Sequence, residues 1–320
     1  MTGLRAVYRK ELEDHFSSVR FILLMTVILM VSLLTAYMVG SGLRKELEGM
    51  QRPSMLFLLL FTSTGALLSL AQFIAFFGPL IGMVLGFDAI NRERAARTLS
   101  KVLSQPIYRD AVINGKFLAG LTVIAVMLLA IVLLISGLGL RVLGVVPGWE
   151  EVARLAVYLV LSVVYIGFWL GVAILASVLF RSIATSALAT LALWIFFAFF
   201  MALGASLVAD IVTPLPPGLS QDPEALVRRE GTQRMVASLS PMTLYSEATG
   251  TILDPMRKTT RSLVLVGPFE RLSMSRFQNP LPLVQSALIV APHLISLVAI
   301  TMVCFAVCYA VFMRQEIRST

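Results

Sequence analysis

Few residues of this chain could do metal, acid–base or nucleotide chemistry. Cys304 and Cys308 share one helical face, and the nearby Met302 and Met313 would add soft ligands of the kind that cuprous copper prefers. Cys and Met are also ordinary core residues, so this pair is a candidate metal site only. His293, the one acid–base side chain within an apolar segment, could bind a proton or ligand, or be hydrogen-bonded at a helix contact.

Nucleotide hydrolysis by the chain itself is not expected. Its one Gly-Lys pair, Gly115–Lys116, has Asp110 where the first glycine of a phosphate-binding loop would stand. We therefore expect the chain to bind no cofactor, and uphill transport would need energy from another polypeptide. The shortage of charged residues in the apolar segments and the lack of a convincing internal repeat argue against an ion-coupled transporter.

The most distinctive polar segment is NRERAARTLSKVLSQPIYRD at residues 91–110. Its apolar residues recur at spacings of three and four, and basic residues line the opposite stripe, which predicts a helix over 91–104. Pro106 would end this helix, and a second helix would start near Asp110. Such an amphipathic helix could lie on anionic lipid headgroups or dock on a cytosolic protein.

The elements that must position this segment are membrane spans. The 320-residue chain is 58% hydrophobic and only 14% charged, with a mean hydropathy of +0.88, which is typical of membrane proteins. A bilayer core of about 30 Å requires roughly 20 helical residues. Six segments are long enough: about 21–40, 66–87, 117–140, 155–180, 183–205 and 285–313. The predicted fold class is an all-α integral membrane protein with six transmembrane helices.

Basic residues that flank the spans predict that both termini are cytoplasmic, as expected for a multi-pass protein of the cell membrane. With this orientation the cytoplasmic segments contain more than twice as many Lys and Arg residues as the short external loops. Residues 1–20 would form an amphipathic cytoplasmic helix, and residues 88–116 a cytoplasmic loop between spans 2 and 3, within the unit 21–205 that holds spans 1–5. The net charge of +8 then reflects topology and contact with membrane lipid, not nucleic-acid binding.

Residues 206–284 are too long for a simple loop and too apolar to be disordered, so they predict an external helical segment. Asp222–Pro223 and Ser240–Pro241 are typical helix starts. This segment could simply pack on the spans, or it could dock a substrate or an external accessory protein. Residues 285–320 would form the sixth span and a cytoplasmic tail.

Glycine residues mark a close helix contact on the second span. Gly78, Gly82 and Gly86 recur every four residues and would let another helix approach closely. That contact could lie within the chain, at a dimer surface or along a translocation pathway. The apolar run that precedes this span, MLFLLLFTSTG at 55–65, would form a separate short helix at the outer interface.

The segment NRERAARTLSKVLSQPIYRDAVINGKFLAG resembles the cytoplasmic loop of the type-two ABC transporter permeases. The family pattern is Glu, then Gly-Thr-Leu, leucines, Ser-(Gln/His)-Pro-(Val/Ile), Arg, and Gly-Lys at the start of the third span. The matching residues are Glu93, Thr98, Leu99, Leu103, Ser104, Gln105, Pro106, Ile107, Arg109, Gly115 and Lys116. Arg97 stands where the family usually has glycine, an exchange that a continuous helix would tolerate.

Three further segments extend the resemblance over most of the chain. YRKELEDHFSSVRF is similar to the family's N-terminal amphipathic helix. SPMTLYSEAT at 240–249 and the C-terminal FMRQEIR are similar to the branch that includes the permease of nitrous-oxide-reductase maturation.

The resemblance implies that the chain is a permease subunit, and not itself an enzyme, of an ATP-binding-cassette exporter. Two cytoplasmic ATPase subunits would bind ATP and Mg²⁺, and the loop would be the coupling helix that docks on them. A second permease copy, identical or similar, would complete the transporter. The residues implied in ATPase coupling are Glu93, Arg94, Thr98, Leu99, Leu103, Ser104, Gln105 and Pro106.

In that family the first, second and fifth spans line the interface between the two copies, so Gly78, Gly82 and Gly86 become candidates for the wall of the translocation pathway. Two other functions stay open. The chain could be a non-transporting membrane scaffold that transmits movement to an external partner, or an ATP-independent secondary transporter. Neither the residues nor the resemblance indicates a substrate.

Overall fold

The fold is an all-helical bundle. The computed structural model describes residues 2–46, 55–62, 69–98, 108–214, 223–255 and 280–315, and all regular elements in these ranges are helices. Six helical stretches are long and apolar enough to cross a membrane: Val19–Lys45, Leu70–Ala95, Arg109–Leu143, Trp149–Leu179, Ile183–Val212 and Leu283–Arg314. The predicted all-α membrane protein with six spans is confirmed.

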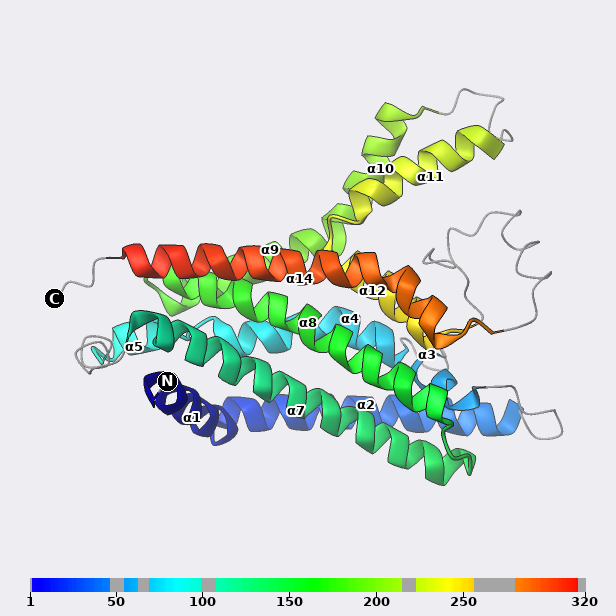
Figure 1. Ribbon diagram of the computed structural model, residues 1–320, viewed down its shortest axis with the longest axis horizontal. Coiled ribbons are helices and arrows are strands. Elements are labelled where there is room, and N and C mark those ends of the chain that lie inside the picture. Colours follow the sequence, from blue (N-terminus) through cyan, green and yellow to red (C-terminus); the bar gives the residue numbers. More distant parts are fainter. Residues whose placement is uncertain are drawn as a thin grey trace.

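The start of α1 and the end of α14 lie at the same end of the bundle (Figure 1). Successive spans alternate in direction along the long axis. The main helices are α1 (Thr2–Phe16), α2 (Val19–Glu46), α4 (Leu70–Gly86), α5 (Asn91–Ala95), α7 (Arg109–Leu143), α8 (Trp149–Leu179), α9 (Ile183–Ile195) and α14 (Leu283–Arg314). We call the end with α1, α5 and the last residues of α14 the terminal end, and the end where α8 begins the opposite end.

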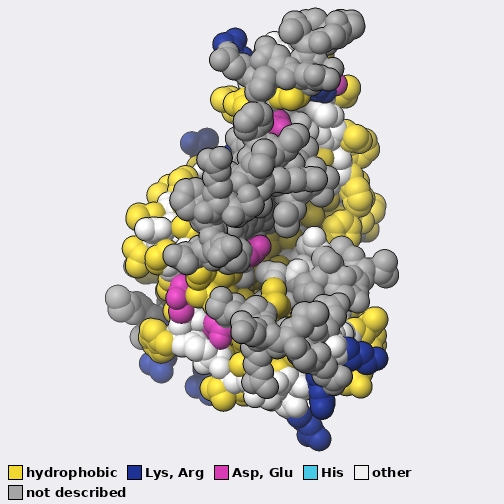
Figure 2. All heavy atoms as spheres, turned by 90° about the vertical axis from the view of Figure 1, so that its right-hand side faces the viewer, with side chains coloured by type: hydrophobic (Ala, Val, Ile, Leu, Met, Phe, Trp, Pro, Cys, Tyr) yellow, Lys and Arg dark blue, Asp and Glu magenta, His cyan; other side chains and the backbone are white. Residues whose placement is uncertain are grey.

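Helix α8 is the centre of the core. It contacts α4, α7 and α14, and its large side chains Tyr158, Tyr165 and Trp169 are fully buried. By contrast, α2, α9 and α14 leave most of their apolar surface exposed. Seen from the opposite end, apolar side chains cover the visible flanks of the bundle (Figure 2). Such flanks suit contact with lipid or with another membrane helix.

The short apolar segment before the second span forms η1 (Leu56–Leu58) and α3 (Leu59–Thr62). It is separate from α4, as predicted, but it does not lie on the surface. Phe57, Leu60 and Phe61 are buried in the core. The Phe57 N–H donates to Glu151 Oε1 at 3.0 Å, which fixes the segment to the start of α8.

The fifth candidate span changes direction at a π-helical turn. After α9, a π-helical turn η2 (Phe196–Phe200) leads into α10 (Met201–Val212), which leaves the bundle and pairs with α11 (Pro223–Ala237) (Figure 1). A π-turn inserts an extra residue and commonly redirects a helix. The predicted boundary at residue 205 therefore falls inside α10, and the candidate span runs on to Val212.

Helix α12 (Pro241–Leu253) shows how part of the predicted helical segment 206–284 packs on the spans. Both predicted helix starts, at Pro223 and Pro241, are confirmed. However, α12 is not laid over the bundle; it is buried between α4, α8 and α14. Tyr245 stacks on Tyr165 with ring centroids 4.3 Å apart, and its hydroxyl lies 2.7 Å from Ser162 Oγ.

A buried arginine fastens α12 and α14 to α8 at the opposite end. Arg154 has no exposed surface. Its Nη1 donates to the Ile252 carbonyl at 2.9 Å and to Ser286 Oγ at 3.3 Å, and its Nη2 donates to the Leu281 carbonyl and to Glu150. One side chain thus connects three helices through hydrogen bonds to charged and neutral acceptors.

Candidate coupling site at the terminal end

The loop after α4 begins with a much shorter helix than predicted. Helix α5 ends at Ala95, and Arg97 adopts a left-handed conformation with φ of 55°. The Thr98 N–H donates to the Glu93 carbonyl and the Arg97 N–H to the Arg94 carbonyl, both at 3.0 Å. These two bonds form a Schellman motif, in which the left-handed residue is usually glycine. The helix predicted over 91–104 is therefore wrong, because the chain turns at Arg97.

The predicted coupling residues fall into three groups. Leu99, Leu103, Ser104, Gln105 and Pro106 lie outside the described residues. Thr98 is exposed, as are Ala95, Ala96 and Arg97 before it. Glu93 is buried and Arg94 is half-buried, so both face the protein. The described surface that a partner could touch is therefore the turn 95–98.

Glu93 belongs to a buried group of three charged side chains. Lys116 Nζ of α7 lies 2.8 Å from Glu11 Oε1 of α1 and 2.9 Å from Glu93 Oε1 of α5. All three side chains are at most 10% exposed. We call Glu11, Glu93 and Lys116 the ionic junction. It connects the N-terminal helix, the loop and the third span through one ammonium group.

The charge of Lys116 offsets the effect of burial on Glu11. Burial alone would raise the pKa of Glu11, but the charge and hydrogen bond of Lys116, with a smaller contribution from Lys10, hold this pKa below its ordinary value. Lys10 Nζ lies 3.3 Å from Glu11 and 3.7 Å from Glu93 at the exposed edge of the junction. The second oxygen of Glu93 has no hydrogen-bond partner among the described residues.

Gly115 explains how α1 comes close enough to reach Lys116. A Cβ at this position would lie 2.7 Å from Val7 Cγ1 and 3.3 Å from the Tyr8 nitrogen. The absence of a side chain therefore lets the backbone of α1 approach α7 closely. About two turns further along α7, Thr122 Oγ1 lies 3.0 Å from the Tyr8 hydroxyl. The Gly-Lys pair therefore has a structural role: Gly115 lets α1 approach α7, and Lys116 binds Glu11 and Glu93.

A second set of contacts fixes the loop to the C-terminal end of α14. Arg94 donates to the Gln315 side chain and to the Val178 carbonyl, and Arg109 donates to the Gln315 carbonyl at 3.1 Å. The N–H groups of Ile90 and Asn91 both donate to the hydroxyl of a serine on α8, Ser177. The turn 95–98 is therefore held on both sides by buried or half-buried contacts.

The glycine stripe of α4 lies against α8 of the same chain. Added Cβ atoms would lie 2.6 Å from the Ile166 carbonyl oxygen at Gly82 and 2.8 Å from Ala173 Cβ at Gly86, and Gly78 also faces Ile166. All three glycines are buried. Among the alternatives, the contact within the chain accounts for the stripe, and these glycines do not face an open surface that could serve as a pathway wall.

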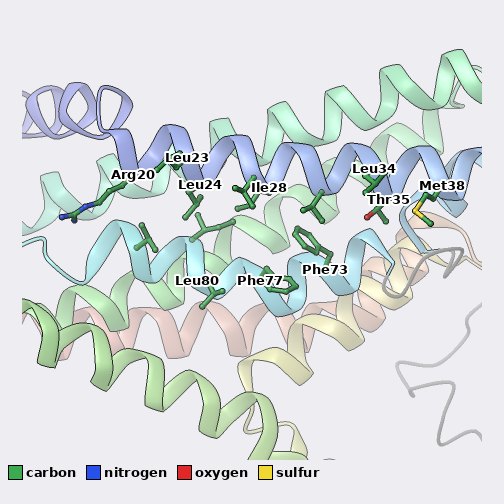
Figure 3. Close-up of a pocket in the computed structure, with 14 residues that line it drawn as sticks. Arg20, Leu23, Leu24, Ile28, Leu34, Thr35, Met38, Phe73, Phe77 and Leu80 are labelled. Atoms are coloured by element: carbon green, nitrogen blue, oxygen red, sulfur yellow. The ribbon is translucent and has the colours of Figure 1, made fainter.

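The open surface of the second span lies beside this stripe. A groove of about 820 Å³ runs between α2 and α4 (Figure 3). Leu24, Ile28, Phe73 and Phe77 are among its apolar lining residues. At the terminal end of the groove, Arg20 Nη1 donates to Asp88 Oδ2 at 2.6 Å. The groove is apolar along its length and charged only at this end.

The candidate metal site at Cys304 and Cys308 and the candidate ligand site at His293 both lie in ordinary helix contacts. Cys308 is buried and Cys304 half-buried, and no third His, Cys, Asp or Glu joins them among the described residues. Met302 is largely exposed. His293 Nε2 lies 3.2 Å from Glu247 Oε2 of α12, so this histidine takes part in a helix contact, as its alternative reading predicted.

Sequence reasoning missed the residues that reach these sites from distant segments. Glu11, Arg154 and Glu247 were not among the predicted site residues, yet each is bound to another helix. For Glu11 a signal existed: it lies one turn after Val7 on the same helical face. That face carries the two residues of α1 that are buried.

A family comparison agrees with this architecture, whereas a comparison with curated proteins finds no match. The model of the family described as "ABC-2 family transporter protein" matches residues 5–317, which is nearly the whole chain. The six spans, the helical bundle and this match together show that the chain belongs to the ABC-2 transporter family, whose members are membrane subunits of ABC transporters.

Proposed function

We propose that this chain is the permease subunit of an ATP-driven exporter, and that residues 88–116 transmit movement from a separate cytoplasmic ATPase. The observation that supports this most is the anchoring of the exposed turn 95–98. Glu93 on one side is bound to Lys116, and Arg94 is bound to Gln315. A force applied to this turn would pass directly into α7 and the end of α14, because the connecting side chains are packed and paired.

The ATPase would hold ATP and Mg²⁺, and this chain would supply the membrane pathway. In this proposal both termini and the turn 95–98 are cytoplasmic, and two ATPase subunits bind two permease copies. The second copy, identical or similar, would face the groove between α2 and α4 and the exposed face of α9 and α10. Within the family we place the chain in the branch of the nitrous-oxide-reductase maturation permease, because of the segments 240–249 and 312–318.

Affinity purification from the native membrane tests the proposal. An ABC ATPase is expected to co-purify with the wild-type chain. Leu99→Asp and Leu103→Asp, in the part of the loop outside the described residues, are expected to release the ATPase or to uncouple hydrolysis from transport. Val146→Asp is the matched control, because Val146 is exposed at the opposite end. Full ATPase binding and coupled turnover in both leucine variants would refute the coupling role.

One observation favours the alternative of a mechanical scaffold. The hairpin of α10 and α11 projects from the bundle, and Arg229 pairs with Asp210 across it. Such a projection could dock an external protein. ATP-dependent movement of a solute into sealed vesicles would support the permease, whereas ATP-dependent capture of an external protein without solute movement would support the scaffold. Solute movement without any ATPase would indicate a secondary transporter.

A further inference from the structure

The ionic junction has more contacts than a loop anchor requires. A lysine paired with one glutamate would suffice to hold α5 on α7. Here Lys116 also binds Glu11, which comes from a helix at the other end of the sequence. Lys10 and Arg92 extend the same charged group toward the surface, where Arg92 lies 3.9 Å from Asp14 and Lys10 lies 3.8 Å from it.

The geometry points to a specific role: Lys116 is a positioning residue that makes α1 move together with the coupling loop. This inference rests on the proposed function. Because the same ammonium binds a carboxylate of α1 and a carboxylate of α5, neither helix can shift relative to α7 without breaking a buried ion pair. The N-terminal helix is then part of the moving lever, and not a separate anchor on the membrane surface.

Burial makes this link stiff. Lys116 is 4% exposed, and water cannot easily replace either carboxylate as its partner. The close packing of Val7 on Gly115 adds a steric contact one turn away. If α5 moved without α7, Glu93 would lose Lys116 and become an unpaired buried carboxylate. If α1 moved without α7, the same would happen to Glu11.

A further ion pair connects the start of α5 to the first span. Residue Asp88, three positions before α5, binds Arg20 at the start of α2. A polar cavity of about 240 Å³ next to the junction is lined by Glu11, Lys116, Arg20 and Asp88. Movement of α1 and α5 as one body would therefore act on the first span, which forms one wall of the groove.

The test uses the permease purified with its ATPase and returned to lipid vesicles. Val146→Cys at the opposite end is labelled with charged maleimide dyes, which do not reach Cys304 and Cys308 in the membrane. Energy transfer between two permease copies is recorded before and after ATP with vanadate. Asp14→Cys with Arg92→Cys, joined by a short bismaleimide, reports whether α1 stays on the loop.

The decisive variant is Glu11→Gln, which leaves a neutral Lys116–Glu93 pair, so the complex should still fold. Its matched control is Glu13→Gln, the same chemical change at a position on α1 whose side chain is 67% exposed. We expect Glu11→Gln to retain the ATPase, to lower the cross-link yield, and to reduce the ATP-dependent change in energy transfer by about fivefold or more. Lys116→Met should reduce it further, and Glu13→Gln should not.

The outcomes separate the two proposals. If the wild-type complex contains no ATPase or shows no response to ATP, the proposed function fails and the inference with it. If the wild-type complex responds and Glu11→Gln responds equally, the inference is overturned while the proposed function stands. Loss of the ATPase from Glu11→Gln would also overturn it, because the junction would then belong to the docking surface. A merely structural role would lower the yield of complex without changing its response.

Discussion

The two ends of the bundle are held together in different ways. At the opposite end, Arg154 and Glu151 bind mainly backbone groups: Arg154 donates to two carbonyls, and Glu151 accepts from two N–H groups. At the terminal end, the ionic junction joins side chain to side chain across three helices. Bonds to backbone groups fix a segment in place, whereas the buried ion pairs of the terminal end bind α1 and α5 to one lysine of α7. The opposite end therefore holds neighbouring segments by their backbone, and the terminal end holds helices through paired side chains.

The largest effect is expected from Arg154→Met, which removes every hydrogen bond that the Arg154 side chain makes. The buried Ile252 carbonyl and the part-buried Leu281 carbonyl would lose their donor, and Glu150 would lose its partner. We expect the free energy of unfolding to fall by about 3–5 kcal/mol. Thermal unfolding in detergent measures this. Arg141→Met, at an exposed position near the end of α7, should change it little. Equal stability of the two variants would contradict the role of Arg154 in fastening α12 and α14 to α8.

A smaller loss is expected from Gly82→Ala, which tests the α4–α8 contact between the two ends. The new Cβ would lie 2.6 Å from the Ile166 carbonyl and 2.8 Å from the Leu170 nitrogen, so backbone must move. We expect a loss of about 1–3 kcal/mol in the free energy of unfolding. Gly137→Ala is the control, because nothing lies within 4 Å of its added Cβ. Tolerance of both changes would mean that α4 and α8 are not closely packed.

Arg97→Gly should stabilise the terminal end by about 1 kcal/mol or less. Glycine adopts the left-handed conformation without the steric cost that arginine bears, although it adds entropy to the unfolded chain. Resistance of the loop to limited proteolysis reports the gain. Arg92→Gly, within α5, should have the opposite sign because glycine weakens a helix. Faster cleavage of Arg97→Gly would show that the turn is not strained.

The smallest effect concerns pH and again separates the two ends. Burial, with Lys116 and Arg92, lowers the pKa of His15 although Glu11 opposes the shift, and the pKa of Glu11 is also lowered. Both groups therefore favour docking of α1 at pH values above their ordinary pKa. That contribution is lost on acidification, from about pH 6.5 downward for His15 and below about pH 4.5 for Glu11.

The cross-link between cysteines at positions 14 and 92 measures this dependence. Its yield should fall between pH 8 and pH 5, and His15→Gln should remove that part of the change. At the opposite end Arg154 donates to backbone carbonyls, so unfolding of that end should depend less on pH. A yield that rises on acidification would contradict the direction of both pKa shifts.

Much of the fold could be predicted from the sequence. Six long apolar segments sufficed for the spans, because a bilayer demands a minimum helix length. Proline and serine marked the starts of α11 and α12 correctly. The polar loop between spans 2 and 3 was located correctly, but its first helix was predicted to be too long. Spacing alone does not reveal a left-handed turn at a residue other than glycine.

The location of α12 could not be predicted in this way. Its sequence is less apolar than a span, so it was assigned to the helical segment 206–284, without a prediction of which spans it would contact. In the structure, stacking of Tyr245 on Tyr165 and the bond to Ser162 satisfy its polar groups inside the bundle. The same holds for Glu247, which meets His293 only because α12 is buried.

The sequence by itself determined that the chain is a six-span membrane protein with a polar loop between spans 2 and 3, because hydropathy and length are local properties. Only the tertiary structure decided which charges meet. Glu11 and Lys116 are 105 residues apart in the chain, and their pairing depends on the close approach that Gly115 allows. Side-chain pairing across helices depends on packing, and no local pattern of residues encodes it.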